Sequence, residues 1–358
     1  DVLSSRCKPH HGDPKGCLTS LLSGDSNQTV AGFAVVRRTS VSNGSIPILT
    51  EPEALEYAYE YVAATGFECD AIVSAGGEVF FVYRLDRTGH IARVFSGNKC
   101  ASGTGEFFLQ QIRRMNLSVD EATDLAVSEP SPYKVSGRCS VFCKSDCTHA
   151  LNKGTSKQRV VAGLCEMMAG KIVDLLKQSG CRRPMLVGGV ARNRAVVEML
   201  RREFPQVIVP DEAPWFEALG AALYASRNGC TPDIHPDHVF PYQVSSFELL
   251  PPLSQHTSLV TFLQSQRGEL RADDECILGL DVGSTTTKAV LLRIKDNAIV
   301  AAVYLRTDGD PVEASRKCYA DLARQVGSVP HSIVGLGTTG SGRYIAGLHS
   351  LTPSVINE

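Results

Sequence analysis

The sequence predicts an α/β protein in which helices pack on mixed β-sheets, and three observations carry this prediction. Short apolar runs of strand length alternate with longer helical stretches over most of the 358 residues. Glycine pairs follow two of the predicted strands, at Gly76-Gly77 and at Gly188-Gly189. A polar Gly-Ser-Thr turn joins two apolar strands within residues 277–293. The chain has room for two domains of ordinary size, each with its own core.

An internal repeat frames the chain. Each copy has, in order, a Gly-Asp-Pro turn, a helical run and an apolar strand. In the first copy the turn is Gly12–Pro14, the helical run ends near Leu22 and the strand is Val30–Val36. In the second copy the turn is Gly309–Pro311, the helical run extends through Ala323 and the strand is Ile333–Gly337. The same three features in the same order favour a duplication over chance.

Between the two copies, hydrophobic periodicities of 3.6 and 2 mark the remaining elements. They are a helix at Glu53–Ala64, strands at Ala71–Val73 and Val79–Leu85 with a turn at Asp86–Gly89, helices at Glu106–Met115 and Val160–Lys177, a strand at Met185–Val187, and helices at Ala195–Glu203 and Phe216–Ala225. Five prolines then interrupt the pattern. We therefore predict a first module at 1–228, a linker at 229–275 and the start of a second module at 276–358.

Composition excludes several classes of function. With 43% hydrophobic and 21% charged residues the chain is globular, and a net charge of −2 gives no basic surface for nucleic acid. No apolar run is long enough for a membrane span. Twelve cysteines at irregular spacing, without an export signal, favour the reducing cytoplasm over a disulfide framework. The first residue is Asp rather than Met, so we expect a fragment of a longer protein.

The turn within 277–293 has the chemistry of a phosphate-binding hairpin. A glycine lets backbone N–H groups approach phosphate oxygens, three hydroxyls add short donors, and a lysine adds positive charge. An aspartate at the end of the first strand suits a hydrated Mg²⁺. These residues are Asp281, Gly283, Ser284, Thr285, Thr286 and Lys288. The alternative is an ordinary hairpin with a polar tip.

The two glycine pairs are candidates for the rest of a nucleotide site. Gly76-Gly77 precedes Glu78, and Gly188-Gly189 precedes a helix that begins near Asn193, where a nucleoside could pack closely. Each pair alone is equally consistent with a tight turn. The small residues of 217–225 are better explained by close helix packing than by ligand binding.

Cysteines mark a second kind of site. Cys100 lies in a glycine-rich loop before a predicted helix, whose N-terminus would stabilise a thiolate or an anionic cluster. Cys139, Cys143 and Cys147 recur at every fourth residue, which aligns three sulfurs on one helical face. The alternative is a stripe of small core residues. The spacing matches neither a zinc pair nor a ferredoxin.

Four segments together resemble one family of proteins. They are Asn98-Lys-Cys-Ala-Ser-Gly-Thr-Gly, Gly137-Arg-Cys-Ser-Val-Phe, Gly188-Gly-Val-Ala-Arg-Asn and Glu217-Ala-Leu-Gly-Ala-Ala-Leu-Tyr-Ala. They resemble activators of 2-hydroxyacyl-CoA dehydratases, and residues 281–288 resemble the same family's opening motif. The resemblance implies the ATPase fold of actin, sugar kinases and heat-shock chaperones (ribonuclease H-like), with one domain nearly complete and one partial. The tandem order is similar to that of long, two-module members.

The resemblance also implies an activity, namely ATP-driven, low-potential electron transfer to a 2-hydroxyacyl-CoA dehydratase or a related enzyme. In the family, two modules hold one [4Fe–4S] cluster, and the matching ligands here are Cys100 and Cys139. The implied cofactors are ATP, Mg²⁺ and the cluster, with Asp281 and Glu78 as catalytic candidates. The implied partners are the dehydratase, an electron donor, and a second module or a second copy of the chain.

Departures from the family pattern keep two alternatives open. Ser74 and Val79 stand where the family has aspartates, and Arg37 aligns with Gly340 of the second copy. Cys143 and Cys147 are additional, so four cysteines could come from one chain. The alternatives are a sugar or acid kinase of the same fold and a non-catalytic scaffold module. Because each module lacks what the other has, the hairpin at 276–303 is a candidate to complete the first module as in a circular permutant.

Overall fold

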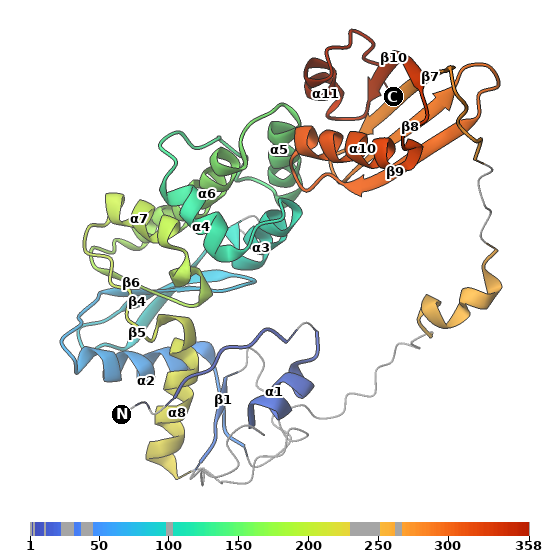
Figure 1. Cartoon of the computed structure of the whole chain (residues 1–358). Helices are drawn as coiled ribbons and strands as arrows, with labels where there is room; N and C mark the ends of the chain where they lie inside the picture. Colours follow the sequence, from blue (N-terminus) through green and yellow to red (C-terminus); the bar gives the residue numbers. More distant parts are fainter. Residues whose placement is uncertain are drawn as a thin grey trace. The chain divides into compact units, whose positions relative to one another are not determined.

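A computed structural model describes residues 2, 4–10, 12–22, 32–36, 46–97, 103–229, 251–261 and 267–357. The chain forms two compact units, each built from two separate stretches. Figure 1 labels the helices and strands. Unit 1 comprises Asp1–Phe107 with Cys165–Phe247, and unit 2 comprises Phe108–Leu164 with Glu248–Glu358. The predicted division into two modules and a linker stays a prediction. It describes a duplication of sequence, whereas the two units describe which residues pack together.

The main sheet of unit 1 has four strands in the order β5-β4-β3-β6. The strands are β3 (Ala71–Ala75), β4 (Phe80–Leu85), β5 (Ile91–Ser96) and β6 (Pro184–Val187). β3 runs parallel to β6 and antiparallel to β4, and every residue of β3 and β6 is buried. Their continuous apolar runs suit this buried position. The predicted turn at Asp86–Gly89 joins β4 to β5, with the Asp86 N–H donating to the His90 carbonyl at 2.8 Å.

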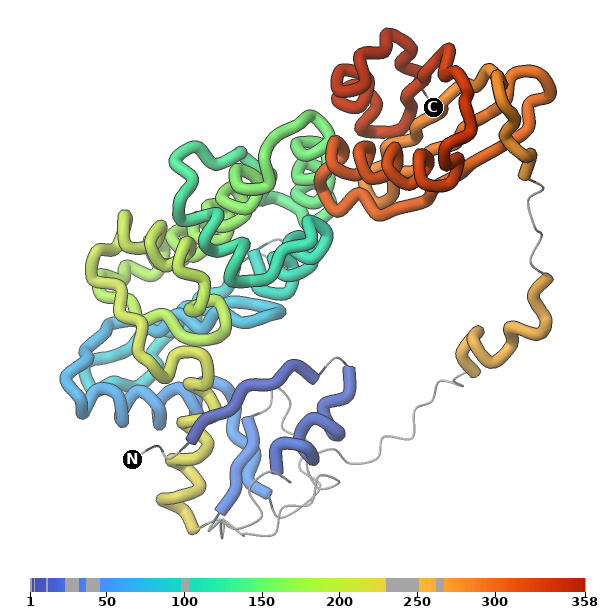
Figure 2. Tube along the Cα trace, viewed as in Figure 1, coloured from blue at the N-terminus to red at the C-terminus, as the bar shows by residue number. Residues whose placement is uncertain are grey.

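Helices and a small second sheet complete unit 1. The helices are α1 (Pro14–Leu22), α2 (Glu51–Ala63), α7 (Arg194–Glu203) and α8 (Phe216–Asn228), with 3₁₀ turns η3 (Gly189–Arg192) and η4 (Ala213–Trp215), and α6 (Lys157–Ser179) crosses from unit 2. β1 (Val35–Val36) pairs in parallel with β2 (Ile48–Leu49). α8 lies beside β1 although nearly two hundred residues separate them in sequence (Figure 2).

The predicted strand Val30–Val36 is shorter than expected. Residues 30 and 31 lie outside the described ranges, and of Gly32–Val36 only Val35 and Val36 form a strand. The pairing with β2 accounts for this length, because β2 offers two residues for pairing.

The sheet of unit 2 contains the predicted hairpin. Its strands are β7 (Asp274–Val282), β8 (Thr286–Arg293), β9 (Ile299–Arg306) and β10 (His331–Thr339), in the order β10-β7-β8-β9. β10 is parallel to β7, and the other pairs are antiparallel. Every second residue of β7, from Cys276 to Val282, is buried against α10 (Pro311–Val326) and α11 (Arg343–His349). This period of two gives the sheet one core face.

The other helices of unit 2 come from the middle of the chain. They are α3 (Gly105–Arg114), which begins in unit 1, α4 (Val119–Val127) and α5 (Ser140–Asn152). A capping box starts α4, with Ser118 and Glu121 satisfying each other's backbone N–H groups. In the predicted linker the 3₁₀ turn η5 (Leu253–Leu259) has no buried residue, and the first three prolines lie outside the described residues.

The two predicted repeat copies share the same backbone hydrogen bonds. The N–H of Asp13 donates to the carbonyl three residues earlier at 2.7 Å, and that of Asp310 does so at 2.9 Å. Each aspartate then caps its helix, accepting from the backbone N–H of Gly16 at 2.8 Å or of Glu313 at 3.0 Å. The parallel pairing of β1 with β2 is matched by a parallel bridge between Thr338 and Val355. The geometry thus agrees with a duplication.

Among the residues described, none of the helices combines the length and the apolar character that crossing a bilayer requires.

Candidate functional site

Unit 1 contains a cavity of about 640 Å³ at the carboxyl ends of β3 and β6. The two strands are parallel and adjacent, so the turns that follow them meet at one sheet edge. Gly76 follows β3 and Gly188-Gly189 follow β6, and all three line the cavity. In α/β proteins this edge is where ligands bind. The two glycine pairs predicted as separate turns therefore meet at one place.

The backbone at Gly188 is in very close contact with the neighbouring strand. Gly188 has φ +90, and a Cβ atom there would lie 2.5 Å from the Ala75 carbonyl oxygen. Its N–H donates to the Ala213 carbonyl at 2.7 Å. α3 starts against the turn that follows β3. The Gly105 N–H donates to the Gly76 carbonyl at 3.0 Å, and the Glu106 N–H donates to the Gly77 carbonyl at 2.9 Å. The glycines thus hold two strands and a helix start together.

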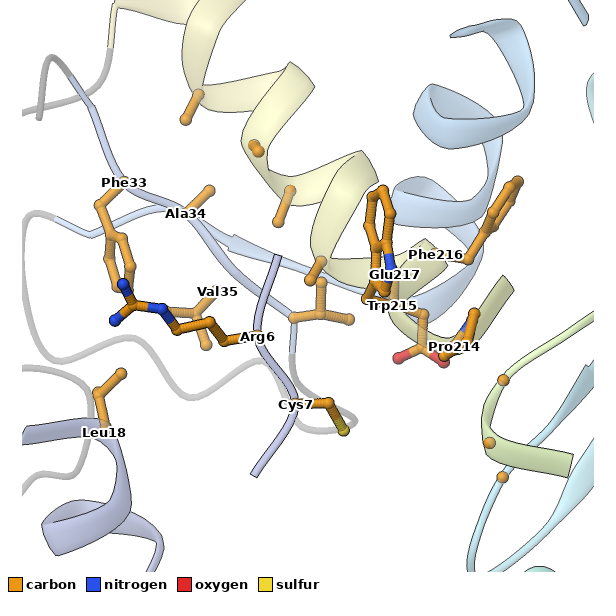
Figure 3. A pocket seen from close by; sticks show the side chains of 18 of the residues that line it. Arg6, Cys7, Leu18, Phe33, Ala34, Val35, Pro214, Trp215, Phe216 and Glu217 are labelled. Carbon is orange, nitrogen blue, oxygen red and sulfur yellow. The ribbon is translucent and has the colours of Figure 1, made fainter. Parts of the chain in front are cut away.

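The wall opposite the glycines is mostly apolar. Figure 3 shows Phe33 on one side of the cavity and Trp215 with Phe216 at the start of α8. Further lining residues are Arg6, Cys7, Leu18, Val35, Glu217 and the small residues Ala218, Ala221, Ala222 and Ala225. An apolar wall facing polar backbone groups is typical of small-molecule sites.

Helix α8 has two roles. The predicted role of its small residues in helix packing applies to Gly220, where a Cβ atom would lie 1.8 Å from the Ala54 carbonyl oxygen of α2. The alanines on another face line the cavity. The sequence reasoning missed this second role and also Trp215. The aromatic pair Trp215-Phe216, immediately before a run of small residues, was the signal that could have revealed it.

Three predicted nucleotide residues lie near this edge without lining the cavity. Gly77 and Glu78 are exposed on the turn after β3. Asn193 is buried, caps α7 by accepting from the Val196 N–H at 3.2 Å, and lies beside the Cys165 thiol. Ligand contacts by these residues stay predictions.

The predicted phosphate hairpin is present in unit 2. β7 and β8 pair up to Val282 and Thr287, which leaves Gly283, Ser284 and Thr285 at the tip before Thr286 begins β8. The Gly283 N–H donates to the Thr286 carbonyl at 3.0 Å and so closes the turn. Thr285 is exposed.

A residue that the sequence reasoning missed holds this tip in place. Thr307, immediately after β9, donates its N–H to the Thr285 carbonyl at 3.0 Å and its hydroxyl to the Gly283 carbonyl at 2.8 Å. Its hydroxyl also lies 2.9 Å from that of Thr287. Both threonines are buried, so these hydrogen bonds are shielded from water.

Asp281 and Lys288 form an ion pair across the hairpin. Lys288 Nζ lies 2.8 Å from Asp281 Oδ2, and both side chains are about one-third exposed. On the other side, a Cβ atom at Gly340 would lie 2.5 Å from Asp281 Oδ1, and the Gly342 N–H donates to the Val282 carbonyl at 2.8 Å. The second copy's glycine turn therefore lies against the end of β7.

The cysteines of α5 fall into two environments. Cys139 is the N-cap of α5, half-buried, and its side chain makes no capping hydrogen bond. Cys143 and Cys147 are buried among core residues, and a hydrogen bond to Cys143, followed by burial, raises the pKa of the Cys147 thiol. Cys100 lies outside the described residues. Ligation by these four residues therefore stays a prediction.

Other predictions for the cysteines can be compared with the described structure. Cys165 and Cys181 are buried, as predicted for small core residues, and burial raises the pKa of Cys165 to about 12. None of the ten cysteines in the described ranges forms a disulfide bond. No group of three or more His, Cys, Asp or Glu side chains that could hold a metal occurs among the described residues, which do not include Cys100.

Comparison with known proteins places these features in a family context. A model of the BadF/BadG/BcrA/BcrD ATPase family matches residues 29–225, more than half of the chain. The 2-hydroxyisocaproyl-CoA dehydratase activator of Clostridioides difficile is 33% identical over 160 residues, which are 44% of this chain and 60% of the relative. An activator of lactoyl-CoA dehydratase from Anaerotignum propionicum is 33% identical over 159 residues, 43% of this chain and 60% of the relative. The chain thus spans about 60% of the length of these curated relatives.

A solved structure supports the fold. The activator of the 2-hydroxyisocaproyl-CoA dehydratase from Clostridium difficile with bound ADPNP has a TM-score of 0.55 and 24% sequence identity. The match covers 74% of this chain and 90% of that protein. The predicted α/β ATPase fold is therefore confirmed.

Proposed function

Because this chain belongs to the BadF/BadG/BcrA/BcrD ATPase family, we propose that it binds ATP and couples ATP hydrolysis to electron transfer. The acceptor would be a 2-hydroxyacyl-CoA dehydratase or a related acyl-CoA enzyme. The observation that supports this proposal best is the unit 1 cavity, where the glycine turns after parallel β3 and β6 face an apolar wall. Relatives named as dehydratase activators support the choice of partner.

In the unit 1 cavity, the adenosine would lie along the apolar wall. Trp215 and Ala222 offer flat and small surfaces to the base, whereas Gly76, Gly188 and Gly189 allow the backbone to approach the phosphates. Glu78 is exposed on the turn that follows β3, two residues after Gly76. Glu78 would then orient the attacking water.

In unit 2, the hairpin would bind phosphate by an exchange of partners. Lys288 now neutralises Asp281 at 2.8 Å. A phosphate at Ser284 and Thr285 would attract Lys288, since a lysine binds phosphate as a mobile point charge. The released Asp281 carboxylate would then accept hydrogen bonds from waters of a hydrated Mg²⁺, which suits its position at the end of a strand.

The electron-transfer part of the proposal concerns Cys139. This residue begins α5 without a side-chain cap, so the first-turn N–H groups can stabilise a thiolate or an anionic cluster. The residue type and position fit one ligand of a [4Fe–4S] cluster, with Cys100 as the other from this chain. When bound, the cluster supplies a one-electron carrier. A second copy or second module would contribute the remaining cysteines, and twelve cysteines at irregular spacing favour a reducing cytoplasm.

The nucleotide part is tested by fluorescence, because Trp215 is the single tryptophan of the chain and lines the cavity. Titration with Mg·ATP or Mg·ADPNP is expected to give a saturable change in emission. Ala222 lines the cavity and is exposed, so Ala222→Leu narrows the cavity without disturbing the core. This variant is expected to weaken nucleotide binding roughly tenfold, about 1.4 kcal/mol.

The matched control is Ser226→Leu, which adds the same side chain at an exposed α8 position outside the cavity lining. It is expected to bind as the unmodified chain does. Equal weakening by both variants, or no response of Trp215 to either nucleotide, would contradict the nucleotide site and favour the scaffold alternative.

A further inference from the structure

Within unit 2, a side chain at the end of α5 forms a hydrogen bond to the turn Gly340–Gly342 that follows β10. Asn152 is the last residue of α5 and is 7% exposed. Its Nδ2 donates to the Ser341 hydroxyl at 2.7 Å. Ser341 lies between Gly340 and Gly342, in the turn that follows β10, and is itself exposed. The buried Asn152 amide at the end of α5 thus depends on the Ser341 hydroxyl in the turn after β10.

The surrounding contact is tightly packed. A Cβ atom at Gly309 would lie 3.2 Å from Leu151 Cδ1, and one at Gly154 would lie 2.6 Å from Ile345 Cδ1. Both glycines have positive φ, +67 and +85 respectively. Close-packed groups of this kind cannot move independently, because either a gap or an overlap costs energy. A displacement of the glycine turn would therefore reach the end of α5.

The glycine turn also touches the hairpin. Gly340 lies against the Asp281 carboxylate, and Gly342 donates to the Val282 carbonyl at 2.8 Å. The hairpin-tip residue Ser284 lines a small cavity together with Cys147, Thr148 and Asn152. Ser341 therefore stands between two glycines that contact the end of β7, and its own hydroxyl is bonded to the last residue of α5.

We infer that Asn152 is a positioning residue that couples phosphate occupancy of the hairpin to helix α5 through the Ser341 hydroxyl. Ser341 accepts from Asn152 and keeps its own proton to donate to a phosphate oxygen. Phosphate binding would extend a chain from Asn152 to Ser341 to phosphate, and consecutive hydrogen bonds strengthen one another. The last turn of α5 would thereby become more stable. Cys139 is the N-cap at the other end of the same helix.

The coupling is reciprocal, because two sites linked by one free energy affect each other equally. Any change that loosens the last turn of α5 would weaken phosphate binding at the hairpin by the same factor. This inference rests on the proposed function, since it assumes that the hairpin binds a nucleotide phosphate.

The test is amide hydrogen exchange on the full chain, with and without Mg·ADPNP. In the unmodified chain, exchange is expected to slow by about fivefold both at the hairpin tip, residues 283–286, and at the end of α5, residues 149–153. In Asn152→Ala and in Ser341→Ala the tip is expected to respond, and the end of α5 is not. Ser341 is exposed, so its substitution removes no buried side chain and takes away only the acceptor of the Asn152 amide.

The control is Asn228→Ala, which removes an exposed amide that donates to the Tyr224 carbonyl at 2.9 Å within α8. Both responses should persist in this variant. A response at the tip alone in the unmodified chain would overturn the coupling while the proposed hairpin site stands. No response at either segment would overturn both, and a persistent α5 response in Asn152→Ala and Ser341→Ala would assign the coupling elsewhere and overturn the role of Asn152.

Discussion

Gly188 illustrates how one residue can serve both the fold and the candidate site. The sequence marked it as a place where a nucleoside could approach the backbone. In the structure it adopts φ +90 and lies so close to β3 that a Cβ atom would be 2.5 Å from the Ala75 carbonyl oxygen. The glycine is thus required by the neighbouring strand whether or not a ligand is bound.

Gly188→Ala is expected to lower the free energy of unfolding of unit 1 by about 3 kcal/mol, because strain at positive φ adds to a steric overlap with backbone. Gly170→Ala provides a control of opposite sign. Gly170 is an exposed residue of α6 with nothing within 4 Å of its would-be Cβ, so alanine should add about 1 kcal/mol. Urea unfolding followed by Trp215 fluorescence measures both, and equal effects would contradict the packing argument.

Helices α1 and α10 begin with the same local sequence but contribute differently to the stability of the fold. Both follow a Gly-Asp-Pro turn, and in both the aspartate caps the first turn. α10 buries Cys318 and Leu322 against the sheet of unit 2, whereas α1 has no buried residue. The cap is therefore encoded locally, but its contribution to overall stability depends on what the helix packs against.

Asp310→Ala is expected to lower the free energy of opening of α10 by about 1 kcal/mol, because the Glu313 N–H loses its acceptor. The measurement is amide exchange across residues 311–326, where opening requires loss of core contacts. Asp13→Ala should change exchange only within 14–22, since an unburied helix opens locally. An unchanged α10 in Asp310→Ala would show that packing alone sets its boundary.

At the scale of the whole molecule, the candidate ligands for a cluster do not form a set within the described residues of the chain. Cys139 is half-buried at the start of α5, while Cys143 and Cys147 are buried in the core. The raised pKa of the buried Cys147 thiol makes it a poor metal ligand, because a ligand must be a thiolate. This environment favours a cluster shared between chains over one held by four cysteines of one chain.

Anaerobic purification and reconstitution is therefore expected to yield about two irons per chain in a dimer, since a four-iron cluster would be shared by two chains. Iron, acid-labile sulfide and solution mass should be measured on one sample. Cys139→Ser is expected to lose the iron, and Cys165→Ser, a change at a buried core thiol, should retain it. About four irons in a monomer would instead assign Cys143 and Cys147 as ligands, and no iron would contradict electron transfer.

The sequence by itself determined the elements and the motifs. Periodicity located many of the helices and strands to within a few residues, although α4 and β9, among others, were not predicted and the strand at Val30–Val36 is shorter than expected. The residues of 281–288 were sufficient to predict the hairpin, because strand pairing across a short turn depends on near neighbours. The repeat was also visible in sequence, since a turn, a cap and a helix start are encoded within a few positions.

Only the tertiary structure decided which distant side chains meet. It brought Trp215 to the glycine turns, buried Cys143 and Cys147, and paired Asn152 with Ser341 across 189 residues of chain. Such contacts arise because apolar faces must be buried together, and their partners are chosen by packing over the whole unit. Local sequence patterns contain no record of that choice.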